Sequence, residues 1–229
     1  MTQSFPTNER LMIGSLLAAS AGGFDAFTYL QHGEVFAGLQ TGNLILLGVH
    51  LGQGQFGVTI HYLIPILAFI FGTMVARFFQ HTIKKSKQPL AAPQLIITWE
   101  ILLTAIVALA DPVLPDLLAS ALISMTAAAQ LQEFRKLKGG PFTSLMMTGN
   151  LRTVAEGIYD GLIHHNTDAS RKALDILTII LSFSFGAGLV GGFSHMFSHY
   201  VILISTLFLS IIWFVFWRSR LILSKEQGK

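Results

Sequence analysis

The sequence predicts an all-α membrane protein, and three observations lead to this fold class. The first is composition: of 229 residues, 52% are hydrophobic and only 12% are charged, whereas a soluble domain carries about 25% charged residues. The second is a set of long runs without Asp, Glu, Lys or Arg, the longest at residues 35–76 and 176–217. A helix of about 20 apolar residues crosses a hydrocarbon core. The third is an internal repeat.

The other bulk properties remove some classes of function. The pI near 9.3 does not indicate nucleic-acid binding, because the basic residues fall in small groups between apolar segments rather than on one surface. The chain has no cysteine, which excludes disulfides and thiolate chemistry. We expect no cofactor.

Eight hydrophobic segments are expected, at about residues 11–31, 35–51, 59–79, 94–110, 114–134, 142–163, 172–196 and 200–217. Lys and Arg gather on the cytoplasmic side of short loops. If all eight segments cross, no orientation places the basic groups together. If 35–51 and 142–163 instead enter and return on one side, every basic group is cytoplasmic: Arg10; Lys84, Lys85 and Lys87; Arg135, Lys136 and Lys138; Arg171 and Lys172; Arg218, Arg220, Lys225 and Lys229.

This arrangement predicts six transmembrane helices plus two re-entrant or broken half-helices, with both termini in the cytoplasm. The loop with Asp111 and Asp116, which has no basic residue, lies outside. Irregular backbone at membrane depth is tolerated only where protein or a watery cavity surrounds it.

The internal repeat divides the single membrane domain, 1–229, into two halves at about 11–110 and about 114–217. Residues 40–44, Gln-Thr-Gly-Asn-Leu, return as residues 147–151, Met-Thr-Gly-Asn-Leu, so Thr41 and Thr148 are 107 positions apart. In the six-helix topology the halves run in opposite directions, and inverted repeats with broken helices are typical of channels and secondary transporters. The alternative is that duplication only makes a stable bundle.

The two Thr-Gly-Asn motifs are the strongest candidates for a solute site. Gly permits a sharp backbone reversal, and Thr and Asn side chains are expected to cap the exposed N–H groups of a short helix. Two helix N-termini facing each other favour an anionic or neutral polar solute. The alternative is a structural turn with side chains that satisfy only local backbone. The candidates here are Gln40, Thr41, Gly42, Asn43, Thr148, Gly149 and Asn150.

Asp25 is the next candidate. It lies about 21 Å along a helix that begins near Leu11, within a hydrocarbon core of about 30 Å. A carboxylate there is costly and is a functional candidate by default. It could carry a proton or bind solute, or it could form an internal hydrogen bond to backbone or to Gln40. Its repeat equivalent is Gln132, which is polar but uncharged.

Other polar residues favour structural roles. We expect Glu100 to pair with Arg77, because buried charges are usually paired, and Arg152 to pair with Glu156 at i,i+4 spacing. His195 and His199 have the spacing of two metal ligands, but without a third ligand nearby they are predicted to be interfacial histidines, so no metal site is expected.

With these residues assembled, the sequence resembles the YoaK-like family of bacterial membrane proteins, a domain of unknown function. The resemblance rests on 23–26 (Gly-Phe-Asp-Ala), 35–37 (Val-Phe-Ala) and the first Thr-Gly-Asn, with Gln130, Gln132 and the second Thr-Gly-Asn in the other half. It implies a multi-pass protein of the bacterial plasma membrane. It implies no substrate or activity.

Three hypotheses remain. The first is a channel or secondary transporter for a small polar or anionic solute, with Asp25 as gate or proton site. The second is an intramembrane enzyme acting on a lipid, with Asp25 or Glu100 as acid or base, which lacks a convergent catalytic set. The third is a non-catalytic membrane scaffold. The expected partners are the lipid bilayer and a small solute, with a second copy of the chain as a further candidate and nucleic acid excluded.

Overall fold

The computed structural model describes residues 5–83 and 90–227. Lys84, Lys85, Lys87 and Lys229 of the basic groups lie outside the described residues. The described chain forms eight α-helices: α1 (Leu11–Gln31), α2 (Gln40–Gly52), α3 (Phe56–Ile83), α4 (Ala91–Ala110), α5 (Asp116–Glu133), α6 (Met147–Ile163), α7 (Thr167–Phe197) and α8 (Leu203–Gln227). Short elements join them: the 3₁₀ turns η1 (Thr7–Glu9), η2 (Asp111–Val113) and η3 (Ser198–Ile202), and the hairpin of β1 (Lys136–Leu137) and β2 (Gly140–Pro141).

The all-α membrane class predicted from composition is confirmed. Among the described residues, four helical stretches are long and apolar enough to cross a membrane: Leu11–Gln31, Phe56–Ile83, Ala91–Ala110 and Thr167–Ser224. The last of these contains α7, η3 and most of α8. The outer faces of these helices carry exposed apolar side chains, among them Phe71, Met74 and Leu181. Such surface is stable against lipid chains, so the bilayer is the protein's surroundings.

Two close helix crossings form the centre of the bundle. α1 packs along α7, and α3 packs along α5. A side chain at Gly22 would collide with the backbone of Phe183, and one at Gly72 would come within 2.6 Å of the Met125 Cα. Small residues at such crossings let two backbones touch, which is how transmembrane helices gain packing without a hydrophobic driving force.

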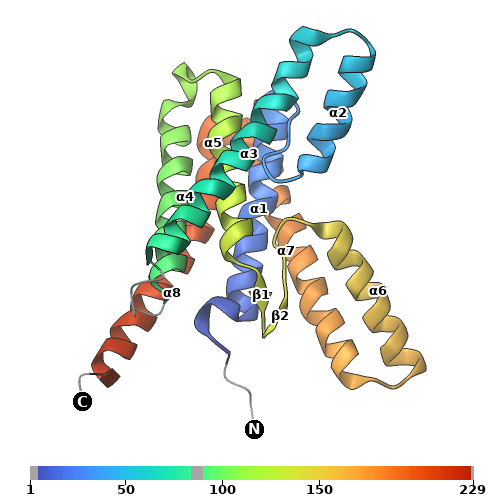
Figure 1. Cartoon of the computed structure of the whole chain (residues 1–229), viewed down its shortest axis with the longest axis vertical. Helices are drawn as coiled ribbons and strands as arrows, with labels where there is room; N and C mark the ends of the chain where they lie inside the picture. Colours follow the sequence, from blue (N-terminus) through green and yellow to red (C-terminus); the bar gives the residue numbers. More distant parts are fainter. Residues whose placement is uncertain (1–4, 84–89, 228–229) are drawn as a thin grey trace.

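The two short helices lie at the edge of this bundle. α2 packs on α3, the helix that follows it, and α6 packs on α7 in the same way. Figure 1 shows α2 starting near mid-height and running toward the upper end, while α6 starts near mid-height and runs toward the lower end. Few residues of either helix are buried. In each helix the asparagine of the repeated motif is among them: Asn43 in α2 and Asn150 in α6.

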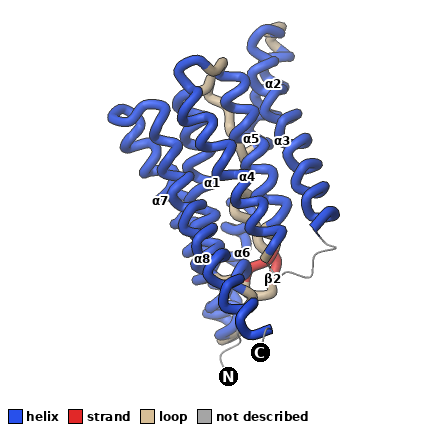
Figure 2. Tube along the Cα trace, turned by 90° about the vertical axis from the view of Figure 1, so that its left-hand side faces the viewer, coloured by secondary structure: helices blue, strands red, loops and turns tan. Residues whose placement is uncertain are grey.

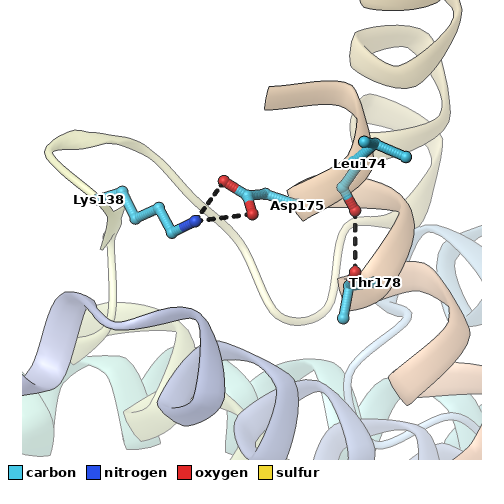
Figure 3. A network of polar contacts seen from close by, with 4 residues as sticks. All are labelled: Lys138, Leu174, Asp175 and Thr178. Atoms are coloured by element: carbon cyan, nitrogen blue, oxygen red, sulfur yellow. Dashed lines mark hydrogen bonds and ion pairs between the residues drawn. The ribbon is translucent and has the colours of Figure 1, made fainter. Parts of the chain in front are cut away.

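One end of the molecule gathers both termini and the β-hairpin (Figures 1 and 2). There Lys138, in the hairpin turn, reaches across to α7 and places its Nζ 2.7 Å from both carboxylate oxygens of Asp175 (Figure 3). The backbone N–H of Lys138 also donates to the Glu9 carbonyl at 2.8 Å. At the opposite end, where α5 starts, the Asp116 Oδ1 lies 3.0 Å from the Nδ1 of His32, which follows α1. These contacts fix the ends of helices distant in sequence.

Candidate functional site

Two loops meet each other inside the protein: the first loop, residues 32–39, leads into α2, and the second loop, residues 142–146, leads into α6. A side chain at Gly38, in the first loop, would collide with the Cδ2 atom of Leu145, in the second. Leu145 is 2% exposed. The two residues are 107 positions apart, the same offset that separates the two Thr-Gly-Asn motifs. The two entering loops therefore touch through equivalent positions, and the space between them is filled by the Leu145 side chain.

Asn43 holds the first loop in shape by bonding backward along the chain. Its Oδ1 accepts from the Phe36 N–H at 2.9 Å, and its Nδ2 donates to the Phe36 carbonyl at 2.7 Å. The same Nδ2 lies 2.9 Å from the Gln40 Oε1. The side chain is fully buried. It thereby fixes the turn that precedes α2, because the N–H and the carbonyl of Phe36 are both bound to the side-chain amide of Asn43.

Asn150 does the same in the second loop with fewer contacts. Its Nδ2 donates to the Thr143 carbonyl at 3.1 Å and lies 3.6 Å from the Met147 sulfur. Thr143 and Met147 stand 107 positions after Phe36 and Gln40. The asparagines thus use equivalent partners in the two loops.

The expected capping of the short helices by Thr and Asn is wrong. No side chain caps the start of α2 or of α6 among the described residues. Thr41 and Thr148 are exposed, as is Gly149, whereas Gln40 and Gly42 are partly buried. The asparagines turn inward and bond the preceding loop, so the threonines are left on the outer face of each helix start.

Asp25 is brought directly to the first loop. Its Oδ1 accepts from the backbone N–H of Gly38 at 2.6 Å and of Leu39 at 3.3 Å. Nearby, Thr28 accepts from the Ala37 N–H at 3.1 Å. Three successive loop amides are therefore satisfied by α1 side chains. Asp25 is 7% exposed, and hydrogen bonds from backbone N–H groups are the interaction that best compensates a buried carboxylate.

Gln132, the repeat equivalent of Asp25, is not brought to either loop. Its Nε2 donates to the Gln80 Oε1 on α3 at 3.0 Å. Gln80 in turn donates to the Glu133 Oε2 at 2.7 Å. Gln132 therefore belongs to a polar cluster at the end of the α3–α5 crossing, apart from Asp25 and the two asparagines.

Gln130 is the central polar residue that the site prediction missed. It is fully buried, accepts from the Ser20 hydroxyl at 3.0 Å, and donates to the Leu17 carbonyl and the Ser144 hydroxyl at 3.0 and 2.7 Å. It links α1, α5 and the second loop. The only sequence signal for it was its place in the family pattern, because its partners are distant along the chain.

The predicted pair of Glu100 and Arg77 is wrong. Arg77 Nη1 bonds the Gln80 Oε1 at 3.3 Å. Glu100 is fully buried, and neither of its carboxylate oxygens has a hydrogen-bond partner among the described residues. The predicted Arg152–Glu156 pair is confirmed, with 3.5 Å between Nε and Oε1.

Three cavities lie away from the two loops. One of about 610 Å³ lies between α3 and the end of α5. A second of about 270 Å³ is an apolar groove between α6 and α7. A third of about 330 Å³ lies between α4 and α8, beside Trp213. None of the three includes Asp25, Asn43 or Asn150 in its lining.

The fold and this buried polar layer define a multi-pass α-helical membrane protein with two short helices that begin inside it. The chain belongs to the family described as "Protein of unknown function (DUF1275)", whose model matches residues 13–215. It is 27% identical over 193 residues to the UPF0700 transmembrane protein YoaK of Bacillus subtilis (strain 168), covering 82% of this chain and 85% of that protein. No solved structure matches the chain significantly. The resemblance to the YoaK-like family is thereby confirmed.

Proposed function

We propose that this protein is a channel or secondary transporter for a small polar or anionic solute, built from two inverted repeats whose entering loops meet at the path of the solute. The observation that carries the proposal is the pair of short helices in Figure 1, which start near mid-height at a buried asparagine and run to opposite ends. Broken helices that meet near the midplane are the way in which many transporters bind solute.

The contacts between helices support a twofold relation between the two halves. If α1–α4 are matched in order with α5–α8, the α1–α7 contact corresponds to the α3–α5 contact, and α2–α3 corresponds to α6–α7. The contacts α4–α5 and α1–α8 also correspond, while α4–α8 corresponds to itself. Equivalent residues, Gly38 and Leu145, touch each other. This is the pattern that a twofold axis through the two loops would produce.

The charged ends support six crossings in a bacterial plasma membrane with both termini in the cytoplasm. The end with the termini also holds the β-hairpin and the turn between α6 and α7, which adjoin the basic groups at 135–138 and 171–172. The connection through η2, with Asp111, lies at the other end. The first end is cytoplasmic by the rule that short basic loops stay inside.

In this conformation the proposed solute path is closed where the two loops meet. Leu145 lies on Gly38, the two buried asparagines bond the backbone of their own loops, and Asp25 on α1 accepts from the Gly38 N–H. A solute path therefore requires the two loops to separate, which is the behaviour of a carrier or a gated channel. The starts of α2 and α6 then present positive helix ends and backbone N–H groups, which favour an anionic or neutral polar solute.

The three described cavities do not support the enzyme alternative. A lipid-processing centre would need a cavity beside an acid or base, and the three cavities do not include Asp25. We therefore propose no reaction.

The test is solute uptake into proteoliposomes that contain the purified chain. The wild type is compared with the double variant Asn43→Ala plus Asn150→Ala, which releases both loops. Leu44→Ala plus Leu151→Ala is the matched control, because these residues are also repeat equivalents, and they are 55% and 57% exposed on the outer faces of the same helices. The screen uses small anions and neutral polyols.

We expect the wild type and the leucine control to move the same solute. The uptake rate of the asparagine variant should differ from theirs by at least tenfold, either lower or, if the released loops leak, higher. A wild type that moves none of the solutes above empty liposomes would refute transport. Equal rates in all three proteins would refute the assignment of the loops as the path.

A further inference from the structure

The cavity between α3 and the end of α5 is the one with a charged lining among the three described. It has a volume of about 610 Å³ and is lined by Thr73, Met74, Arg77, Phe78, Gln132 and Arg135. Two of these six residues are arginines and none is acidic. The lining therefore carries a formal charge of +2, supplied by α3 and by the segment that follows α5.

Neither arginine is neutralised within the part of the chain that the structure describes. The ion pairs there do not include Arg77 or Arg135. Arg77 bonds only the neutral amide oxygen of Gln80. The nearest acid along the chain, Glu133, accepts from the Gln80 amide at 2.7 Å instead. Both side chains are exposed, so an anion from the surroundings can reach them.

The packing of α3 on α5 brings Arg77, on α3, and Arg135, in the segment after α5, to one cavity. The α3–α5 crossing is close, since any side chain at Gly72 would meet the Met125 backbone at 2.6 Å. Near the cavity the two helices are also tied by the Gln132–Gln80 hydrogen bond of 3.0 Å and by the Gln80 bond to the Gln132 carbonyl of 3.3 Å. Such a frame fixes the backbone of α3 and α5 beside the cavity, so that a ligand has only the two arginine side chains to order.

The rim of the cavity is apolar. Met74 and Phe78 are 62% and 65% exposed on α3, a helix apolar enough to span the membrane. A ligand here meets both positive charge and apolar side chains. Planar guanidinium groups bind phosphate oxygens in pairs, and basic pockets between transmembrane helices on the cytoplasmic side bind phosphate head groups.

We propose that this cavity is a binding site for a phosphate-bearing anion, held between Arg77 and Arg135 with Thr73 and Gln132 as further polar contacts. The phosphate comes either from the head group of an anionic lipid or from a free phosphate compound. The proposal does not rest on the transport function, because it uses none of the loop residues on which that function depends.

The experiment measures binding of short-chain phosphatidylglycerol to the purified full-length chain in detergent micelles, by native mass spectrometry. The test variant is Arg77→Gln plus Arg135→Gln. The control is Arg152→Gln plus Arg171→Gln, which removes the same charge from exposed arginines that pair with Glu156 and Asp168. We expect the test variant to bind at least about tenfold more weakly, the effect of losing one charged hydrogen bond, and the control to bind within twofold of wild type.

Two further arms identify the source of the phosphate. Inorganic phosphate that displaces the lipid from wild type at millimolar concentration indicates a free phosphate compound, and failure to displace it indicates the lipid head group. Both results support a phosphate site. Equal binding by wild type and the test variant overturns the proposal, as does equal binding of zwitterionic phosphatidylcholine. If the double variant does not fold, Arg135→Gln alone decides, because Arg135 is exposed and follows α5.

Discussion

α2 and α6 begin with the same Thr-Gly-Asn motif, yet the backbone amides of the loops that precede them are satisfied in different ways. In the first loop, the N–H groups of Gly38 and Leu39 donate to the carboxylate of Asp25 on α1. In the second, the equivalent N–H groups of Leu145 and Met146 donate to the hydroxyl of Thr143, at 3.4 and 3.2 Å. The acceptor comes from another helix in one case and from the loop itself in the other.

The difference explains why only one half needs an acid. The residue of the first loop that is equivalent to Thr143 is Phe36, which has no side-chain acceptor. Asp25 supplies it from α1. Its equivalent on α5, Gln132, is free of that task and instead lines the cavity with the two arginines. One half therefore places its charged group at the loop, and the other places a neutral amide at the cavity between α3 and the end of α5.

The largest expected effect comes from removing the acceptor in each half. Asp25→Ala leaves two loop amides without a partner and should destabilise the protein by about 3 kcal/mol, since bonds to a charged group contribute about 1.5–3 kcal/mol. Thr143→Ala should cost about 1 kcal/mol, because the hydroxyl is neutral and its bonds are longer. The measurement is unfolding in mixed micelles with increasing denaturing detergent.

Asp25→Asn is the control for this first comparison. It keeps an oxygen that can accept from Gly38 and removes the charge, so its cost should fall between those of Asp25→Ala and wild type. If Thr143→Ala destabilises the protein as much as Asp25→Ala, the two acceptors are equivalent and the explanation for Asp25 fails.

A smaller difference is expected between the two asparagines. Asn43 bonds both polar groups of Phe36 and also Gln40, whereas Asn150 bonds one carbonyl and a sulfur, a weak acceptor. Asn43→Ala should therefore cost about 2 kcal/mol and Asn150→Ala about 1 kcal/mol. The same detergent titration measures both. The reverse order would show that the bonds of the two loops do not determine their stability.

The sequence predicts the helices of this protein well because lipid leaves little choice. A segment that crosses hydrocarbon must satisfy its own backbone, so a run of apolar residues becomes a helix. The segment expected at 11–31 is α1, Leu11–Gln31. The last helix extends past the predicted end at Trp217 to Gln227, because hydropathy falls at Arg218 and Arg220 while helical backbone continues into the interface.

The sequence predicts the site only in part. It singles out Asp25, Asn43 and Asn150, which are buried at or beside the loops. It does not predict that the asparagines bond backward to the loop, because the direction of a side chain there depends on the fold of the turn. It misses Gln130, whose partners Leu17 and Ser144 become neighbours only when α1, α5 and the second loop pack together.

The misplaced pair of Arg77 and Glu100 has the same cause. The expected pair rests on the rule that buried charges are usually paired, and this rule says nothing about which way a side chain faces. Arg77 is exposed beside Gln80, whereas Glu100 points into the bundle. Rotation about the helix axis is set by packing against neighbouring helices, which the sequence of one helix does not contain.

The smallest expected effect is a coupling between the two equivalent positions that touch. Gly38→Ala places a methyl group against Leu145 and should cost about 1–3 kcal/mol by overpacking. Leu145→Ala should cost about 2–5 kcal/mol by opening a cavity. In the double variant the new methyl group occupies part of that cavity, so its cost should be below the sum of the two by about 1 kcal/mol. The combination Gly38→Ala with Leu44→Ala serves as control and should be additive, because Leu44 is on the outer face of α2. Strict additivity in both pairs would mean that the two loops do not press on each other, and the contact proposed to close the solute path would then be absent.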